Sequence, residues 1–295
     1  MSAEVQVRTN EPPRLRVASR LGELWRSREV LVNLSRKELK VRYKSSVLGV
    51  LWSMLNPVLY LAIFSLVFVV FLRGGIPKYP IYLLSGLLPW TLFSTGFQGA
   101  TTSVTGNAQL VPKIAFPREV LPMAAIGAQT VNFFFQFAVL AAFMLILFGL
   151  SFVGPSLLLL PAALAVLLVF VLALGFATSS LNVRYRDTGH LVDLLLLAWF
   201  WSTPIVYPAG EVAERMGDTG FFLYLLNPLA NVVLAFQRAL YGAALPGALA
   251  PGVHPPADLS WYWMRLGVVA AASLALLYLA WRLFFRMSGD FAEEL

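Results

Sequence analysis

The residues with the clearest chemical pattern are cations that precede a long uncharged run. Five of them lie within residues 29–46: Arg36, Lys37, Lys40, Arg42 and Lys44. At 100° per residue, all of them except Arg42 share one face of a helix. Such a face can bind the phosphates of anionic lipids or an acidic protein surface. We therefore expect an amphipathic helix at a membrane surface that also contacts protein. The simpler alternative is a solvated charged helix.

Other kinds of chemistry are poorly represented. The chain has no cysteine, which excludes disulfides, thiol catalysis and cysteine-based metal sites. Its two histidines, His190 and His254, are far apart and form no metal motif. Because no Gly-Lys dipeptide occurs, the sequence has no Walker A loop for nucleotide phosphates. We expect a protein that is not an enzyme, holds no cofactor, and takes any energy that it uses from another chain.

One carboxylate stands inside an uncharged run. Asp193 lies about one helical turn into the run that begins at His190. A carboxylate deep in a bilayer would suggest a proton relay. The position of Asp193 close to a loop favours contact with water, Arg184 or Arg186 instead. Since the runs contain almost no other ionisable group, ion-coupled transport is disfavoured.

Aromatic side chains recur along several of the uncharged runs. Those that could line a common passage are Tyr60, Phe64, Phe68, Phe71, Trp90, Phe93, Phe97, Phe133, Phe137, Trp199, Trp201 and Tyr207. Flat apolar faces with occasional hydroxyl or indole donors suit sugar rings, which are themselves amphipathic. The pattern therefore predicts an aromatic-walled passage. Helix packing or contact with lipid is the alternative for any one of these residues.

The elements that must position these residues are membrane-spanning helices. The chain is 59% hydrophobic and only 13% charged, whereas soluble domains carry roughly 25% charged residues. The composition predicts an all-α membrane protein with six transmembrane helices, an N-terminal amphipathic interface helix, and re-entrant helices between spans five and six. The expected spans are residues 47–72, 81–104, 120–149, 156–181, 190–207 and 261–285.

The remaining segments flank or interrupt a membrane domain of residues 47–286. Residues 1–28 and 287–295 are expected to be cytoplasmic tails, on either side of the interfacial helix and the membrane domain. Residues 209–250 are expected to dip into the membrane from outside, because Asn227-Pro228 breaks their apolar block. The positive-inside rule places both termini in the cytoplasm. It does so through the loop cations Lys113, Arg118, Arg184, Arg186, Arg282 and Arg286.

Several segments resemble, in order, the signature segments of ABC-transporter permeases that export polysaccharides and lipid-linked glycans. LKVRYKSSVLGVLWSMLNP (39–57) and YPIYLLSGLLPWTLFSTGF (79–97) are similar to the first two spans of that family. GNAQLVPKIAFPREVLP (106–122) resembles its Asn…Leu-x-x-Lys-x-x-Phe-Pro-Arg-Glu loop. NVRYRDTGHLVDLLLLAWFWSTPIVYP (182–208) is similar to its Arg-Asp loop and fifth span. LNPLANVVLAFQRALYG (226–242) resembles its re-entrant region, and the ending FAEEL also fits.

The resemblance implies a half-transporter in a bacterial inner membrane. Two copies of the chain would form the pore and would bind two copies of a separate ATPase, which would hold ATP and Mg²⁺. The substrate class would be a polysaccharide on a polyprenyl-diphosphate carrier, such as O antigen, teichoic acid, capsule or cell-wall galactan. The excess of arginine over lysine is typical of a GC-rich genome, and with the resemblance it suggests a mycobacterial-type galactan exporter within that range.

The resemblance also implies roles for particular residues. Coupling of the ATPase to the pore would involve Arg36, Lys37, Lys40, Arg42, Lys44, Asn107, Lys113, Arg118, Arg184, Arg186 and Asp187. Asn227, Pro228 and Arg238 would belong to an extracytoplasmic gate, although Gln237 stands where the family pattern has an aromatic residue.

Two rival functions stay open at this point. A permease of the same architecture could export a lipid or a drug. A membrane enzyme or assembly factor could instead act on polyprenyl-linked sugars, but it would need ionisable residues clustered at one membrane face, and the sequence offers few.

Overall fold

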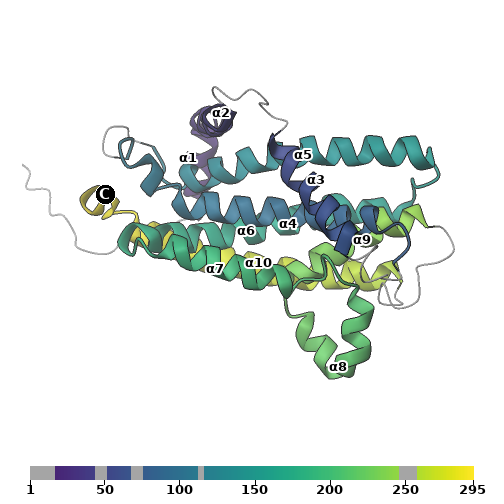
Figure 1. The fold of residues 1–295 in the computed structure, drawn as a ribbon. Coiled ribbons are helices and arrows are strands. Elements are labelled where there is room, and N and C mark those ends of the chain that lie inside the picture. Colours follow the sequence, from purple (N-terminus) through teal and green to yellow (C-terminus); the bar gives the residue numbers. More distant parts are fainter. Residues whose placement is uncertain (1–16, 44–51, 68–75, 112–115, 246–257) are drawn as a thin grey trace, which may run out of the picture.

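The computed structural model describes residues 17–43, 52–67, 76–111, 116–245 and 258–295. Over these ranges the chain forms helices and turns and no strand. The all-helical fold predicted from the sequence is therefore confirmed for the described residues. Figure 1 shows the long helices side by side in an elongated bundle, with shorter helices at both ends.

Helix α4 (Tyr79–Thr102) is the centre of the bundle. It packs against α5 (Val120–Phe148) and α6 (Leu159–Arg184), and α6 in turn packs along α10 (Leu259–Met287). The helices approach closely because small residues face one another. A Cβ added at Gly175 of α6 would lie only 2.7 Å from the Cβ of Ala100 on α4. Close helix packing of this kind is typical of membrane proteins, where small residues let the backbones meet.

The N-terminal region corrects one expectation from the sequence. Residues 17–26, expected to be part of a loose tail, form helix α1 (Val17–Arg26), and a turn at Ser27 leads into α2 (Arg28–Tyr43). The 10 residues of α1 are too few for a stable helix in isolation. The helix is held instead by a contact with a residue far along the chain, which local sequence patterns cannot reveal. Helix α3 (Trp52–Ser65) then enters the bundle.

The region of the predicted fifth span and gate is more broken than expected. Helix α7 (Thr188–Trp201) ends six residues before the predicted limit of 207, and residues 202–208 are not helical. Pro204 explains the early end, because a proline disfavours helical geometry in the residue before it. Helix α8 (Ala209–Tyr224) and helix α9 (Pro228–Ala244) follow at a bend of 113°.

Short helices complete the bundle. A 3₁₀ turn, η3 (Thr105–Asn107), follows α4, and a second, η4 (Pro155–Leu158), leads into α6. Helix α11 (Phe291–Glu294) ends the chain. Contacts place α1, the start of α5 and α11 at one end of the bundle, because Arg20 bonds Glu119 and Arg118 lies over the Phe291 ring. We call this the polar end. In Figure 1 it is the end that carries the C-terminus, and α8 projects near the opposite end.

Within the described residues, three apolar helical segments are long enough to cross a bilayer. These are α5, η4 with α6 (Pro155–Arg184), and α10. The bent pair of α8 and α9 would be a fourth if it were counted as one span, and α7 is a shorter apolar helix. The chain is therefore a multi-pass membrane protein. Of the six expected spans, one, residues 47–72, falls partly outside the described residues.

Candidate functional site

A buried carboxylate joins three helices at the polar end. Glu119 is fully buried directly before α5. Its Oε1 and Oε2 accept hydrogen bonds of 2.8 Å from Nε and a terminal nitrogen of Arg20 on α1, and Oε1 accepts a third, of 3.2 Å, from the indole nitrogen of Trp281 on α10. Two parallel bonds between guanidinium and carboxylate are a strong, directional contact. Glu119 therefore ties α1 to the junction of α5 and α10.

The surroundings of Arg20 strengthen this junction. Arg20 also pairs with Glu23 of α1, and its guanidinium lies 5.1 Å from the centre of the Phe285 ring on α10. Burial by itself lowers the pKa of Arg20, but the hydrogen bonds and charges of Glu119 and Glu23 more than offset it, so that the pKa is raised above its usual value. The neighbouring Arg118 has a pKa lowered by burial. Arg20 thus stays cationic, as the contact requires.

Helix α2 contacts the turn after α4 through two residues that the sequence analysis assigned to coupling. The ammonium of Lys37 donates to Oδ1 of Asn107 at 2.7 Å, and the amide of Asn107 donates to the carbonyl of Ser103 at 2.8 Å. Both residues line a pocket of about 350 Å³ between α2, α4 and α5. Next to it, a Cβ added at Gly127 would lie 3.0 Å from Oγ of Ser35, so α2 rests closely on α5.

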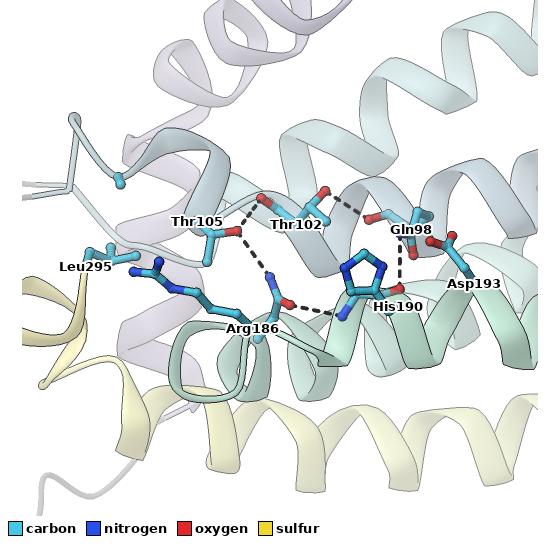
Figure 2. A pocket seen from close by; sticks show the side chains of 10 residues that line it. Gln98, Thr102, Thr105, Arg186, His190, Asp193 and Leu295 are labelled. Atoms are coloured by element: carbon cyan, nitrogen blue, oxygen red, sulfur yellow. Dashed lines mark hydrogen bonds between the residues drawn. The ribbon is translucent and has the colours of Figure 1, made fainter.

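A second pocket lies between α4 and the start of α7, with a volume of about 400 Å³ (Figure 2). Asn182, at the end of α6, organises it. Its Oδ1 accepts from the backbone N–H of Gly189 at 3.1 Å, and its amide donates to Oγ1 of Thr105 at 3.1 Å. Gln98 of α4 donates to the carbonyl of Gly189 at 3.3 Å. These bonds hold the two polar loops, after α4 and after α6, against each other.

Asn182 is a residue that the sequence analysis passed over. It lies in the segment NVRYRDT, where the charged residues that follow it give the stronger sequence signal. Asn182 is buried, whereas the expected coupling residues Arg184, Arg186 and Asp187 are exposed. The charged residues of this loop could be picked out from the sequence. The loop that carries them is held in place by the neutral Asn182, which precedes them.

The other expected coupling residues are dispersed over the polar end. Arg36 and Lys40 are exposed on α2, and Arg118 lies 5.9 Å from the Phe291 ring of α11. Lys44 and Lys113 fall outside the described residues, as does the side chain of Arg42. Asp193 is exposed and lines the second pocket, and Figure 2 shows it at the far side of that pocket from Arg186.

The opposite end is organised by Asn227. Its Oδ1 accepts from the backbone N–H of Leu229 at 3.0 Å and caps the N-terminus of α9. The same oxygen accepts from the indole nitrogen of Trp199 at 2.9 Å, and the amide donates to the carbonyl of Ser202 and to Oγ1 of Thr203, each at 3.1 Å. Asn227 and Pro228 therefore start α9 and fix it against the end of α7.

Buried tyrosines and a glutamine hold the segment between α7 and α8. The hydroxyl of Tyr82 donates to the carbonyl of Tyr207 at 2.7 Å, and that of Tyr79 to the carbonyl of Val206 at 3.1 Å. Gln237 is fully buried in α9, and its amide donates to the carbonyl of Pro204 at 2.8 Å. The departure from the family pattern at Gln237 thus has a packing role. The neighbouring Arg238 is half-buried.

The aromatic residues divide into two groups. Trp90, Phe93, Phe97 and Phe133 are buried within the single chain. Phe93 is 0% exposed and lies between the rings of Phe170, at 5.9 Å, and Trp199, at 5.0 Å. In this structure these residues pack helices together, which is the alternative interpretation of their pattern.

A second group reaches or approaches the surface of the chain. Tyr60 is 45% exposed and Trp201 is 55% exposed. Phe64 stacks on Tyr60 at 6.0 Å and on Phe200 at 6.1 Å, which brings α3 against the end of α7. Phe137, Trp199 and Tyr207 are half-buried. Phe68 and Phe71 lie outside the described residues.

Comparison with known proteins identifies similar chains. The family model described as "ABC-2 type transporter" matches residues 29–241. The O-antigen export system permease protein RfbA of Myxococcus xanthus is 32% identical over 276 residues, covering 92% of this chain and 98% of the relative. The Klebsiella pneumoniae protein of the same name is 32% identical over 78% of this chain and 86% of the relative. The polysialic acid transport protein KpsM of Escherichia coli is 25% identical over 74% and 81%, respectively.

Proposed function

Because the chain belongs to the ABC-2 type transporter family, we propose that it is the membrane subunit of an ATP-driven exporter of polysaccharide. The observation that carries the proposal is the alignment with an O-antigen export permease over 98% of that relative's length. The relatives named for O-antigen and polysialic acid export both concern polysaccharides. The resemblance noted from the sequence motifs is thereby confirmed, and the chain is a transport component.

The substrate that we propose is a polysaccharide on a polyprenyl-diphosphate carrier, such as O antigen, teichoic acid or galactan. The exposed cations at the polar end, among them Arg184 and Arg186, would attract the carrier's diphosphate. Sugar rings would then pass along the aromatic residues that the protein surface offers. Those are Tyr60 and Trp201, with the half-buried Phe64 and Tyr207 beside them.

The assembly that we propose is a homodimer of this chain with two copies of a separate ATPase, which supplies ATP and Mg²⁺. Six crossings per chain, by α3, α4, α5, α6, α7 and α10, belong to this proposal. Figure 1 supports it by showing α4, α5, α6, α7 and α10 running in alternating directions along the bundle, with the shorter α3 oblique to them. The polar end would face the cytoplasm of a bacterial inner membrane, with both termini on that side. The excess of cations in the loops at that end supports this orientation.

A movement of the ATPase would act first on the polar end, and the bundle would transmit it to the gate. Helix α2 contacts the turn after α4 through Lys37 and Asn107, and Asn182 joins that turn to the loop before α7. An ATPase that moved either loop would therefore move the other. Helix α7 runs from this junction to Trp199, which bonds Asn227 at the start of α9. This continuous path supports a gate formed by Asn227, Pro228 and Arg238.

Deletion of the gene tests the proposed function directly. We expect glycan that is still attached to its lipid carrier to accumulate inside the cell and to disappear from the surface, with both effects reversed by the intact gene. Normal surface glycan after deletion would refute polysaccharide export. Accumulation of a lipid without glycan would favour the rival lipid exporter. Co-purification of the tagged chain with an ATPase tests the assembly separately.

A further inference from the structure

Helix α1 has an apolar face that the bundle leaves uncovered. Val17, Leu21 and Trp25 recur every fourth residue and therefore lie on one side of the helix. They are 36%, 53% and 70% exposed, and no residue of α1 is buried. Three exposed apolar side chains in a row, one of them a tryptophan, indicate a surface that contacts something other than water.

The depth of α1 follows from its contacts. Arg20 bonds Glu119 immediately before α5 and lies over Phe285 near the end of α10. At this level α10 changes from an apolar helix to one that exposes two cations, Arg282 and Arg286. Cations that close an apolar span mark the headgroup region of a bilayer. Figure 1 shows α1 beside α2 at this end, both running across the axis of the long helices.

The charges around the apolar face fit an anionic surface. The described residues 17–28 contain three arginines and one glutamate. The guanidinium of Arg28 lies 5.5 Å from the centre of the Trp25 ring, so a cation and an indole stand together at the C-terminal end of the apolar face. Indole rings concentrate at the boundary between headgroups and hydrocarbon, and arginine beside them binds lipid phosphate.

We propose that α1 is a membrane-binding helix. Val17, Leu21 and Trp25 insert into the cytoplasmic leaflet beside the bundle, and Arg28 binds anionic headgroups. The Arg20–Glu119 contact holds the helix at the correct depth, since its docked side adjoins the apolar face. The proposal concerns residues upstream of the segment matched by the family model, which begins at residue 29. It is independent of which substrate the chain exports.

The absence of cysteine from the sequence allows a direct test with single labelled cysteines in the full-length chain. A spin label at L21C reports on the apolar face, and one at G22C is the matched control. Gly22 is exposed and a Cβ there would meet no atom within 4 Å, so the control label fits without disturbing α1. Both variants are placed in lipid nanodiscs containing anionic lipid.

We expect the label at position 21 to collide more often with oxygen, which concentrates in hydrocarbon, than with a water-soluble nickel complex. The label at position 22 should show the opposite preference. Equal access of the nickel complex to both labels would overturn the proposal. A label at position 21 that is shielded from both reagents would also overturn it, because a protein rather than lipid would then cover the face.

Lipid charge provides a second test, in which the label at position 21 stays the same and the lipid is changed. Arg28→Gln should reduce the ratio of inserted to water-exposed α1, as reported by that label, about fivefold in anionic nanodiscs, since each basic residue near such a surface contributes about that factor. In neutral nanodiscs the same substitution should have little effect. An equal effect in both lipids would show that Arg28 acts within the protein and would overturn the assignment of an anionic partner.

Discussion

The two ends of the molecule are held by different kinds of contact. At the polar end, α1 has no buried residue, and a charged pair with one buried carboxylate holds it in place. At the opposite end, nearly every residue of α9 is buried, and neutral side chains bond backbone carbonyls in the segment before α8. One end is attached at a few points, and the other is packed throughout.

This difference fits the roles proposed for the two ends, which are coupling at the polar end and gating at the opposite end. A helix attached through Arg20 and Glu119 can shift as a unit when a partner pulls on it, because few apolar contacts must be broken. The segment before α8 is bonded by Tyr79, Tyr82 and Gln237, and it can move only if α4 and α9 move with it. Input at the polar end would therefore be local, whereas a response at the opposite end would involve the whole bundle.

The largest expected effect comes from Arg20→Ala, which leaves the buried carboxylate of Glu119 without its cation. Breaking such a pair costs about 3 kcal/mol at the lower end of measured values, which suits an arginine that is partly exposed. Hydrogen exchange should show α1 and the first turn of α5 opening far more often, while α9 stays protected. The comparison of the two ends would fail if α9 lost protection to the same degree.

The double variant R20A/E119A isolates the contact itself. Because the second substitution removes the uncompensated charge, the double variant should lose less stability than the sum of the two single variants. Strict additivity would mean that Arg20 and Glu119 act separately and that some other contact holds α1.

At the opposite end, Asn227→Ala should cost about 2 kcal/mol. It removes the cap of α9, which contributes about 1 kcal/mol, and it leaves the indole of Trp199 without its acceptor, which costs about as much again. Asn227→Ser is the matched control, because a serine at this position can still cap α9. Thermal unfolding of the purified protein in detergent should rank N227A below N227S, and equal stability of the two would show that the cap contributes nothing.

The sequence predicts the elements whose signals are local. The uncharged runs predict helices α5, α6 and α10 close to their observed limits. These helices can be predicted from runs of neighbouring residues. Asn227-Pro228, expected as a break in the apolar block, lies where α9 begins, although the cap itself was not predicted. Lys37 and Asn107 were each assigned through the family resemblance, but the hydrogen bond that joins them, across 70 positions of the chain, was not predicted.

Features that depend on distant contacts could not be predicted in this way. Helix α1 needs Glu119, which lies 99 residues away from Arg20. The burial of Phe93 could not be inferred either, because protein-facing and lipid-facing sides of a membrane helix are equally apolar and periodicity alone does not distinguish them. The role of Asn182 could not be predicted either, because a single polar residue next to three charged ones carries little signal of its own.

The smallest stability effect, and the sharpest test of the proposed coupling, belongs to Lys37→Met. The hydrogen bond between Lys37 and Asn107 is exposed and should contribute about 0.5 kcal/mol, so the variant should unfold almost as the parent does. We nevertheless expect fewer polysaccharide chains exported per ATP hydrolysed in the reconstituted transporter, because α2 no longer holds the turn after α4. Lys40→Met is the comparison variant, since Lys40, also assigned to coupling, is exposed on α2 as well but has no hydrogen bond to another described side chain. If both variants lowered the ratio of export to hydrolysis equally, the general charge of α2 would be responsible. The polar end would then act through an electrostatic surface and not through the specific contact seen in the structure.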